Sequence, residues 1–256
     1  MRIISWNVNG IRAAIRKGLD EFVERLRPDI LMLQEIRCLE EQLPENWSPP
    51  EGMQVIYHPA VRKGYSGVST WSNCGIKELG RGMSSEDDEG RILITAHGDL
   101  KLINTYLPSG SSRDDRQLYK ENWMEEFLEW LRPYALSNEP VIVAGDLNIA
   151  HTEDDIWNPV GYRRTSGFLP NEREWFGRLL ESGWRDVCRE QFGKKKGPYS
   201  WWSNRGRARL LDRGWRIDYF LANNAVAEMV TSADIHREGG LVVSDHAPVI
   251  IDLNTV

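Results

Sequence analysis

The sequence has little cysteine and no long hydrophobic run, and both absences exclude classes of protein. Only three cysteines occur among its 256 residues, widely spaced at Cys38, Cys74 and Cys188. Such a set predicts neither a disulfide framework nor a cysteine zinc site, so we expect a reducing, cytoplasmic compartment. No stretch approaches the roughly eighteen apolar residues of a membrane span. The N-terminus enters a strand-like pattern directly, so we expect neither a signal peptide nor a membrane partner.

The composition that is present is that of a globular protein. Hydrophobic residues make up 41% of the chain and charged residues 27%, which is typical of soluble domains. A chain of this length is long for one domain, yet layered α/β proteins of this size often stay single. Since no linker, low-complexity tract or internal repeat divides the sequence, we expect residues 1–256 to form one domain.

Positive charge is concentrated in one segment, although the whole chain is acidic. The formal net charge is -6, but residues 189–216 hold nine basic and two acidic residues, or +7, which leaves -13 for the rest. Tyr199, Trp201 and Trp202 lie among these basic residues. Most charge runs are solvated loops, but basic residues interleaved with aromatic ones suit phosphate contact and stacking on bases or sugars. On this feature we favour contact with nucleic acid.

The hydrophobic pattern predicts many strands and fewer helices. Helices are predicted around Leu19–Leu26, at 116–132 and at 171–182. The buried side of the second helix is expected to carry Leu118, Trp123, Phe127, Leu128 and Leu131. Strands are predicted at 2–8, 30–33, 53–58, 66–72, 91–97, 101–107, 141–144, 215–222 and 247–253. This balance favours two sheets packed together with helices outside.

Polar residues recur where the predicted strands end. Asp146 and Asn148 follow a strand that is predicted to be buried on both faces, and Gly145 is expected to break it. Because alternate residues of an extended chain point the same way, both side chains could face one site. Taken singly, such residues are often turn formers, helix caps or structural histidines. Together they predict a site at converging strand ends, made of Asn7, Asn9, Glu35, Tyr106, Asp146, Asn148, Asp218, Asp245 and His246.

This set of residue types suits one kind of chemistry. Several oxygen ligands with no cysteine and few histidines indicate a hard cation, Mg²⁺ or Mn²⁺, rather than zinc. The nucleophilic-serine motif G-x-S-x-G is absent, and "KGYSGV" at 63–68 lacks the spacing of a nucleotide phosphate loop. A metal with an Asp/Asn pair and an Asp–His pair favours hydrolysis of a phosphate ester by activated water.

Sequence blocks along nearly the whole chain resemble the exonuclease III family of apurinic/apyrimidinic endonucleases. In order, they are "WNVNGIR", "LQEIRC", "GYSGV", "YLPSGS", "GDLNIAH", "SGFLPNEREW", "YSWWSNRGRAR", "GWRIDYF" and "SDHAP". The resemblance implies a four-layered α/β sandwich, with two mixed β-sheets face to face and helices outside. It also implies a Mg²⁺-dependent DNA repair enzyme that cleaves the phosphodiester 5′ to an abasic site in duplex DNA. The products would be a 3′-hydroxyl and a 5′-deoxyribose phosphate.

The same resemblance implies roles for individual residues. Glu35 would be the principal metal ligand, with Asn7 and Asp245 as direct or water-mediated ligands of Mg²⁺ or Mn²⁺. Asp146, assisted by Asn148, would orient and deprotonate the attacking water. His246, held by Asp218, would donate to the phosphate as charge accumulates. Tyr106 would contact the phosphate or assist the leaving group.

DNA contacts are also implied by the resemblance. Trp201, Trp215 and Ile217 match positions that line the pocket for a flipped-out abasic sugar. Without the resemblance, ordinary core packing would be the preferred explanation for Trp215 and Ile217. Further substrate contacts are expected from Asn9, Arg37, Tyr65, Arg113 and Arg205. Arg37 departs from the family, whose members often carry lysine there. Because a planar guanidinium is not equivalent to an ammonium, metal affinity is the property that this difference affects.

Two alternative functions belong to other classes. Some proteins of this fold have lost catalytic residues and act as nucleic-acid-binding regulators, but here all the implied catalytic residues are present. A non-specific nuclease or a phosphoinositide phosphatase would share "GDLN" and "SDHAP", but the tryptophan pocket and "SGFLPNEREW" argue against both. We expect a monomer that acts on duplex DNA, with additional 3′→5′ exonuclease or 3′-phosphodiesterase activity.

Overall fold

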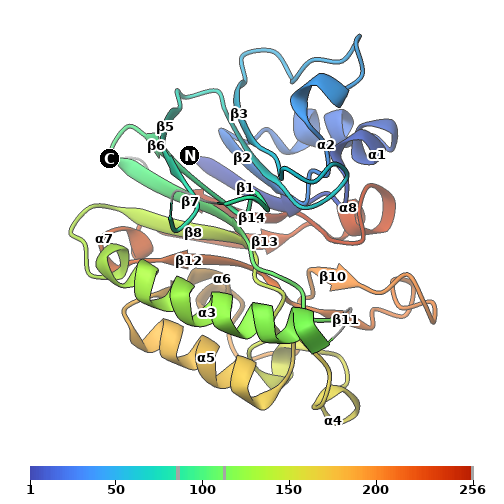
Figure 1. The fold of residues 1–256 in the computed structure, drawn as a ribbon, viewed down its shortest axis with the longest axis vertical. Coiled ribbons are helices and arrows are strands. Elements are labelled where there is room, and N and C mark those ends of the chain that lie inside the picture. Colours follow the sequence, from blue (N-terminus) through green and yellow to red (C-terminus); the bar gives the residue numbers. More distant parts are fainter. Residues whose placement is uncertain (85–86, 112–113, 255–256) are drawn as a thin grey trace.

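The computed structural model describes residues 1–84, 87–111 and 114–254 and contains two six-stranded mixed sheets that pack face to face (Figure 1). The first sheet has the order β13 (Val230–Ile235), β14 (Val249–Leu253), β1 (Arg2–Asn7), β2 (Ile30–Gln34), β4 (Val68–Ser72) and β3 (Gln54–His58). The second has the order β5 (Lys77–Arg81), β6 (Ile92–His97), β7 (Leu100–Tyr106), β8 (Val141–Asp146), β12 (Asp218–Ala222) and β9 (Arg185–Asp186). A separate two-stranded ribbon pairs β10 (Trp201–Trp202) with β11 (Gly214–Trp215).

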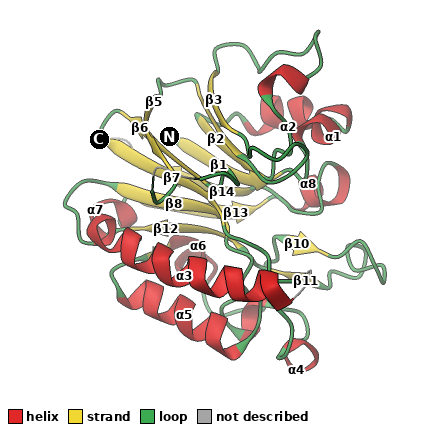
Figure 2. Ribbon diagram, in the orientation of Figure 1, coloured by secondary structure: helices red, strands yellow, loops and turns green. Residues whose placement is uncertain are grey.

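Helices cover the outer faces of both sheets (Figure 2). The first sheet is covered by α1 (Ile11–Arg16), α2 (Leu19–Leu26) and α8 (Arg237–Val242), and the second by α3 (Asp114–Ala135) and α5 (Pro170–Glu181). Shorter helices lie in the connections: η1 (Glu40–Gln42), η2 (Glu153–Asp155), α4 (Pro159–Tyr162), α6 (Val187–Phe192) and α7 (Asn224–Ala227). Within the described part of the chain, none of the helices combines the length and apolar character that crossing a membrane requires.

Strand alternation decides what fills the space between the sheets. Ile3, Met32, Ile142 and Phe220 belong to one buried cluster between the two sheets, whereas the intervening residues pack against the outer helices. The same inward rows continue, at one end of this layer, with buried polar side chains: Asn7, Gln34, Asn104, Tyr106, Asp146 and Asp218. The alternation that builds the core therefore also aims these polar groups at one another.

A buried hydrogen-bond network joins the two sheets beneath that end. Gln34 Nε2 on β2 donates to Asn104 Oδ1 on β7 at 2.8 Å, and Asn104 Nδ2 donates back to the main-chain oxygen of Ser69 on β4 at 2.9 Å. Hydrogen bonds between these buried side chains fix how the two sheets pack on each other, because burial of an amide group without a partner costs free energy. The polar end of the layer thus has a rigid floor.

The predicted sandwich is confirmed, and the differences lie in its details. Gly145 does not break β8, because β8 stays paired with β7 through Asp146, and a Cβ on Gly145 would lie 1.8 Å from Thr105 O. The expectation for Leu118 is wrong: it is 60% exposed, whereas Phe127, nine residues and two and a half turns further along α3, is buried. β5 and β13 were not predicted, because their largely exposed, polar residues lack an apolar alternation.

Candidate active site

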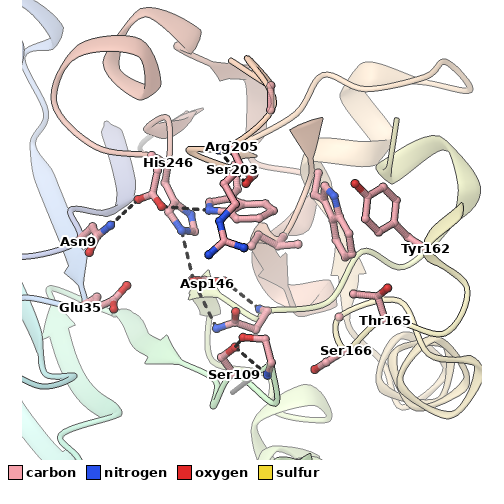
Figure 3. Close-up of a pocket in the computed structure, with 18 of the residues that line it drawn as sticks. Asn9, Glu35, Ser109, Asp146, Tyr162, Thr165, Ser166, Ser203, Arg205 and His246 are labelled. Carbon is pink, nitrogen blue, oxygen red and sulfur yellow. Dashed lines mark hydrogen bonds and ion pairs between the residues drawn. The ribbon is translucent and has the colours of Figure 1, made fainter. Parts of the chain in front are cut away.

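A cavity of about 680 Å³ lies above the polar end of the layer between the sheets (Figure 3). Asn9 and Glu35 lie on one side of it and Tyr162, Thr165 and Ser166 on the other, with Asp146 and His246 between them. The predicted site residues that line this cavity are Asn9, Glu35, Arg37, Tyr106, Asp146, Asn148, Trp201, Arg205, Trp215, Ile217, Asp245 and His246. Residues from every predicted sequence block except "GYSGV" therefore reach one place.

Three of the other predicted site residues lie behind the cavity or beside it: Asn7, Asp218 and Tyr65. Asn7 and Asp218 are buried directly behind Asp146 and His246, to which they are hydrogen-bonded. Tyr65 lines a neighbouring cavity, where its hydroxyl donates to Glu89 Oε1 at 3.2 Å. Arg113 lies outside the described residues.

Three strands of the second sheet bring the acidic and phenolic groups side by side. Tyr106 on β7 pairs with Asp146 on β8, and Asp146 pairs in turn with Asp218 on β12. Asn7, at the end of β1 in the first sheet, reaches across the layer and donates through Nδ2 to Asp146 Oδ2 at 2.9 Å and to Glu35 Oε2 at 3.0 Å. Both sheets therefore fix the position of the Asp146 carboxylate.

His246 and Asp218 form a buried pair next to Asp146. His246 Nδ1 lies 2.9 Å from Asp218 Oδ2, which also accepts a hydrogen bond from Ser200 Oγ at 2.6 Å. His246 Nε2 points toward Asp146, 3.8 Å from its Oδ2. Ser200 was not predicted as a site residue, because one serine within "YSWW" gave no sign of its partner.

Burial and neighbouring charges shift the proton affinities of this cluster. Burial alone would lower the pKa of His246, but the carboxylates of Asp218 and Asp146 outweigh it and raise that pKa. Burial, together with the nearby charge of Asp218, raises the pKa of Asp146. A protonated imidazole beside a carboxyl group of raised pKa is suited to exchanging protons with a bound substrate or water.

Asn148 supports Asp146 from the following turn. Its main-chain N–H donates to Asp146 Oδ1 at 2.8 Å, and its amide Nδ2 donates to Leu107 O at 2.8 Å. Nδ2 also lies 3.5 Å from Asp146 Oδ2. One amide hydrogen of Asn148 is therefore committed to the protein, and the other is only weakly engaged.

Several site residues have left-handed backbone, which is uncommon outside glycine. The φ angles are 47° at Asn9, 54° at Glu35, 51° at Arg37 and 50° at Asn148. The 35–37 turn is held by hydrogen bonds from Ile36 N to Gly67 O at 3.1 Å and from Arg37 N to Ser66 O at 2.8 Å. Such strain persists where the surrounding structure imposes it, and it clusters at functional sites.

The oxygen ligands that the sequence predicted lie at the edge of the cavity. Glu35 accepts a hydrogen bond from Asn7 and forms an ion pair with Arg37. Asp245 accepts from Asn9 Nδ2 at 2.8 Å and from Trp201 Nε1 at 3.2 Å. Burial would raise the pKa of Asp245, but His246 and these donors outweigh it and lower that pKa. These oxygen donors fit a hard cation.

A second candidate cluster lies deeper in the site. Among the described residues, the group whose ligand atoms lie within 4.8 Å of one another consists of Asp146, Asp218 and His246. Its members are already hydrogen-bonded or paired with one another, and an imidazole with a raised pKa is a poor metal ligand. We therefore regard Glu35 and Asp245 as the better oxygen donors for a metal.

Aromatic side chains build the wall opposite Glu35. Trp215 forms its centre, with Trp201 6.0 Å away at 86°, Tyr162 5.2 Å away at 68° and Phe168 6.4 Å away at 74°, all between ring centroids. Ile217 completes the apolar surface. Tyr162, Thr165 and Ser166 were not predicted as site residues; the block "SGFLPNEREW" indicated this region without singling them out.

The basic segment 189–216 is only partly available to a ligand. Arg205 and Arg213 line the cavity, but Arg216 and Arg189 form ion pairs with Asp155, and Arg216 also pairs with Asp186 at 2.8 Å. Tyr199 and Trp202 are buried as well, so Trp201 is the aromatic residue of this segment's "YSWW" stretch that faces the cavity. Of these three aromatic residues, Tyr199 and Trp202 therefore belong to the core, and Trp201 is the one available to a ligand.

Comparison with known proteins identifies the family of this chain. Residues 4–246 match the model of the endonuclease/exonuclease/phosphatase family, and the chain belongs to that family. It is 37% identical to an exodeoxyribonuclease of Bacillus subtilis, over 99% of this chain and 100% of that protein. It is 34% identical to a DNA-(apurinic or apyrimidinic site) endonuclease of Dictyostelium discoideum, over 99% of this chain and 71% of that protein.

Solved structures share the whole fold. An AP endonuclease from Archaeoglobus fulgidus superimposes with a TM-score of 0.91 at 27% identity, with both chains fully covered. A 3′-phosphatase from Neisseria, solved with a product DNA hairpin, gives a TM-score of 0.92 at 26% identity, also with full coverage of both chains. The expected α/β sandwich and the resemblance to this group of nucleases are confirmed.

Proposed function

We propose that this protein is a Mg²⁺-dependent DNA repair endonuclease that hydrolyses the phosphodiester 5′ to abasic sites in duplex DNA. One observation carries the proposal: Asp146 and His246, which is paired with the buried Asp218, line the same cavity as the wall of Trp201, Trp215 and Ile217. A hydrolytic centre beside an aromatic wall suits a substrate whose phosphate is charged and whose neighbouring sugar carries no base. The relatives named as DNA nucleases support the same substrate class.

The resemblance to the family implies a role for each residue, and the hydrogen bonds of these residues support those roles. Asp146, held by Asn7 and by the main chain of Asn148, takes the proton of the attacking water. His246, whose ring is oriented by Asp218, donates to the phosphate oxygen that gains charge in the transition state. Tyr106, at the end of β7 beside Asp146, contacts the phosphate or assists the leaving oxygen.

A divalent metal would be held by Glu35, with Asp245 and Asn7 as direct or water-mediated ligands. In the structure Asn7 Oδ1 accepts from Asn9 N at 2.9 Å, so Asn7 serves best through its position next to Glu35. Mg²⁺, with Mn²⁺ as a substitute, would neutralise charge on the phosphate and the leaving oxygen. Arg37 forms an ion pair with Glu35 and so partly neutralises the negative charge of this metal ligand.

DNA recognition is assigned to the two sides of the cavity. We propose that Asn9, Arg37 and Arg205, which line the cavity, contact the DNA backbone. We also propose Tyr65 and Arg113 as further DNA contacts, as the family resemblance implies. Since Asn7 of the first sheet contacts Asp146 of the second, we also propose that residues 1–256 act as one catalytic domain. We propose in addition that the protein acts as a monomer, because Asp146, Asp218 and His246 all come from this one chain.

An incision assay tests the proposal. The substrate is a duplex with one abasic analogue, end-labelled on either strand, and the control is the matched undamaged duplex. We expect a single cut 5′ to the lesion that leaves a 3′-hydroxyl, is abolished by EDTA and is restored by Mg²⁺. Cutting of both duplexes alike, or cutting that persists in EDTA, would contradict it.

The same assay covers a second candidate activity. The structural similarity to a 3′-phosphatase bound to a DNA hairpin favours processing of 3′ ends. A duplex with a 3′-phosphate at a nick therefore belongs in the experiment. Faster removal of this phosphate than incision at the abasic analogue would make 3′-end repair the main activity.

A further inference from the structure

A fully buried ion pair lies beneath the cavity and takes no part in the roles described above. Lys120 of α3 and Glu172 of α5 are both 0% exposed, and Lys120 Nζ lies 2.6 Å from Glu172 Oε1. A buried ion pair is weak evidence for stability, because desolvation of the two charges offsets their attraction. Its retention next to a cavity therefore needs another explanation.

Lys120 ties this pair to the catalytic turn. Its ammonium also donates to the main-chain oxygen of Asn148 at 2.9 Å. Asn148 has a φ of 50°, and its N–H is the donor that fixes Asp146 Oδ1. One residue thus connects the buried ammonium to the carboxylate that is proposed to activate water.

Glu172 ties the pair to the opposite wall. Its Oε2 accepts from Gly167 N at 2.6 Å and from Leu169 N at 3.0 Å, which caps the start of α5 and fixes the 165–169 loop. Gly167 packs so closely that a Cβ there would lie 3.0 Å from Asn148 O and 3.2 Å from the Trp215 ring. The loop, the catalytic turn and the aromatic wall therefore meet at this pair.

We propose that Lys120 and Glu172 are positioning residues that set the spacing between the hydrolytic group Asp146 and the pocket wall at Trp215. This inference rests on the function proposed above. Burial lowers the pKa of Lys120, and the neighbouring Glu172 carboxylate opposes that shift. Neither side chain lines the cavity, so both act through Asn148 and Gly167.

The test removes both charges at once and uses a matched control. Lys120→Met/Glu172→Gln keeps side-chain volume and leaves no unpaired buried charge, but loses the donor to Asn148 O. The control is Glu125→Gln/Arg178→Met, because Arg178 and Glu125 join the same two helices at exposed positions, 44% and 58% exposed. We measure kcat and KM on the abasic duplex, the rate of 3′-end hydrolysis on undamaged duplex, and thermal unfolding.

We expect kcat of the buried-pair variant to fall by about 10- to 100-fold, the range for a small misplacement of reacting groups, with KM changed by less than about threefold. The control variant should retain wild-type kcat. A purely structural role would instead make activity follow the folded fraction and recover on cooling. A cooperatively folded variant with kcat within about twofold of wild type would overturn the inference.

Two further outcomes separate this inference from the proposed function. If the wild type degrades 3′ ends but ignores the abasic analogue, the proposed function fails, and the fall in the 3′-end rate still decides the inference. If the wild type hydrolyses neither, both are overturned. Should the double variant not unfold cooperatively, Lys120→Gln/Glu172→Gln decides by the same criteria, because it also removes both charges but keeps polar side chains that can hydrogen-bond to each other.

Discussion

At the scale of the residue, the side chain of Asp146 is buried and is held by hydrogen bonds from Asn7 and from the main chain of Asn148. Asn7, Asn148 and His246 approach it from different segments, and only the turn residue Asn148 is close in sequence. The sequence could predict that Asp146 and Asn148 share a site, because strand alternation is local. It could not predict that Asn7 donates to Asp146, since that bond depends on how the two sheets pack.

Asp146→Asn is expected to separate binding from turnover. The change keeps the size of the side chain and removes the base, so incision should fall by about 10²-fold or more. Affinity for abasic duplex should survive or increase, because one negative charge near the phosphate is lost. Single-turnover rates and a binding titration at fixed salt measure the two effects. Parallel loss of binding and rate would mean that Asp146 has a structural role.

Glu35→Ala is expected to raise the Mg²⁺ concentration that half-maximal incision requires. Glu35 offers its carboxylate at the cavity, and its removal should leave the core intact because the side chain lies at the edge of the layer. A Mg²⁺ titration of the incision rate is the measurement, with the exposed Glu41→Ala as control. Normal cutting by Glu35→Ala at limiting Mg²⁺ would remove Glu35 from the metal site.

At the scale of the element, regular buried segments were predictable and exposed or very short ones were not. The segments that became β1, β2 and β8 are short apolar runs of five or six residues, a length that favours buried strands over helices. β9, β10 and β11 are two residues long, and tertiary pairing alone defines them. The cavity wall depends on β10 and β11, which is why Trp201 and Trp215 were placed by family resemblance rather than by pattern.

His97, at the end of β6, is expected to make folding sensitive to mild acid. Burial lowers its pKa from 6.5 to about 4, and its Nδ1 lies 2.9 Å from Gly75 O. At a pH between about 4 and 6.5, the His97 imidazole binds a proton in the unfolded chain but not in the folded protein. The free energy of unfolding therefore falls as the pH drops from 6.5 to 4, by up to about 3 kcal/mol. Urea unfolding across this range should show a shallower pH dependence for His97→Gln. Identical slopes for the two proteins would contradict this.

At the scale of the whole molecule, the residues proposed for hydrolysis and those proposed for recognition of the abasic sugar line one cavity. The first sheet contributes Asn7 and the turn of Glu35, and the second contributes Asp146 and Asp218. The β10–β11 ribbon and the loop before α5 supply the aromatic wall. Under the proposed function, hydrolysis and recognition of damage would be coupled, because the phosphate would be aligned only when the adjoining sugar enters the pocket.

Replacement of Trp201 in the aromatic wall by a smaller residue is therefore expected to weaken discrimination between abasic and normal nucleotides. Turning out an abasic nucleotide costs less than flipping a normal one, and a narrow pocket would accept the bare sugar and exclude one that carries a base. Trp201→Ala should cut abasic duplex less well while losing less activity, or gaining it, on normal nucleotides. Trp201→Phe is the control, because it keeps a ring in the wall and removes the hydrogen bond to Asp245.

The most direct test of recognition by the aromatic wall is a ratio of two kcat/KM values, one for an abasic site and one for a matched normal nucleotide. We would measure this ratio in the wild type and in both Trp201 variants. Salt must be fixed, because phosphate contacts are salt-sensitive. The account predicts a high ratio in the wild type, a clear fall in Trp201→Ala and a smaller one in Trp201→Phe. A wild-type ratio near unity, or an unchanged ratio in a folded Trp201→Ala protein, would contradict it.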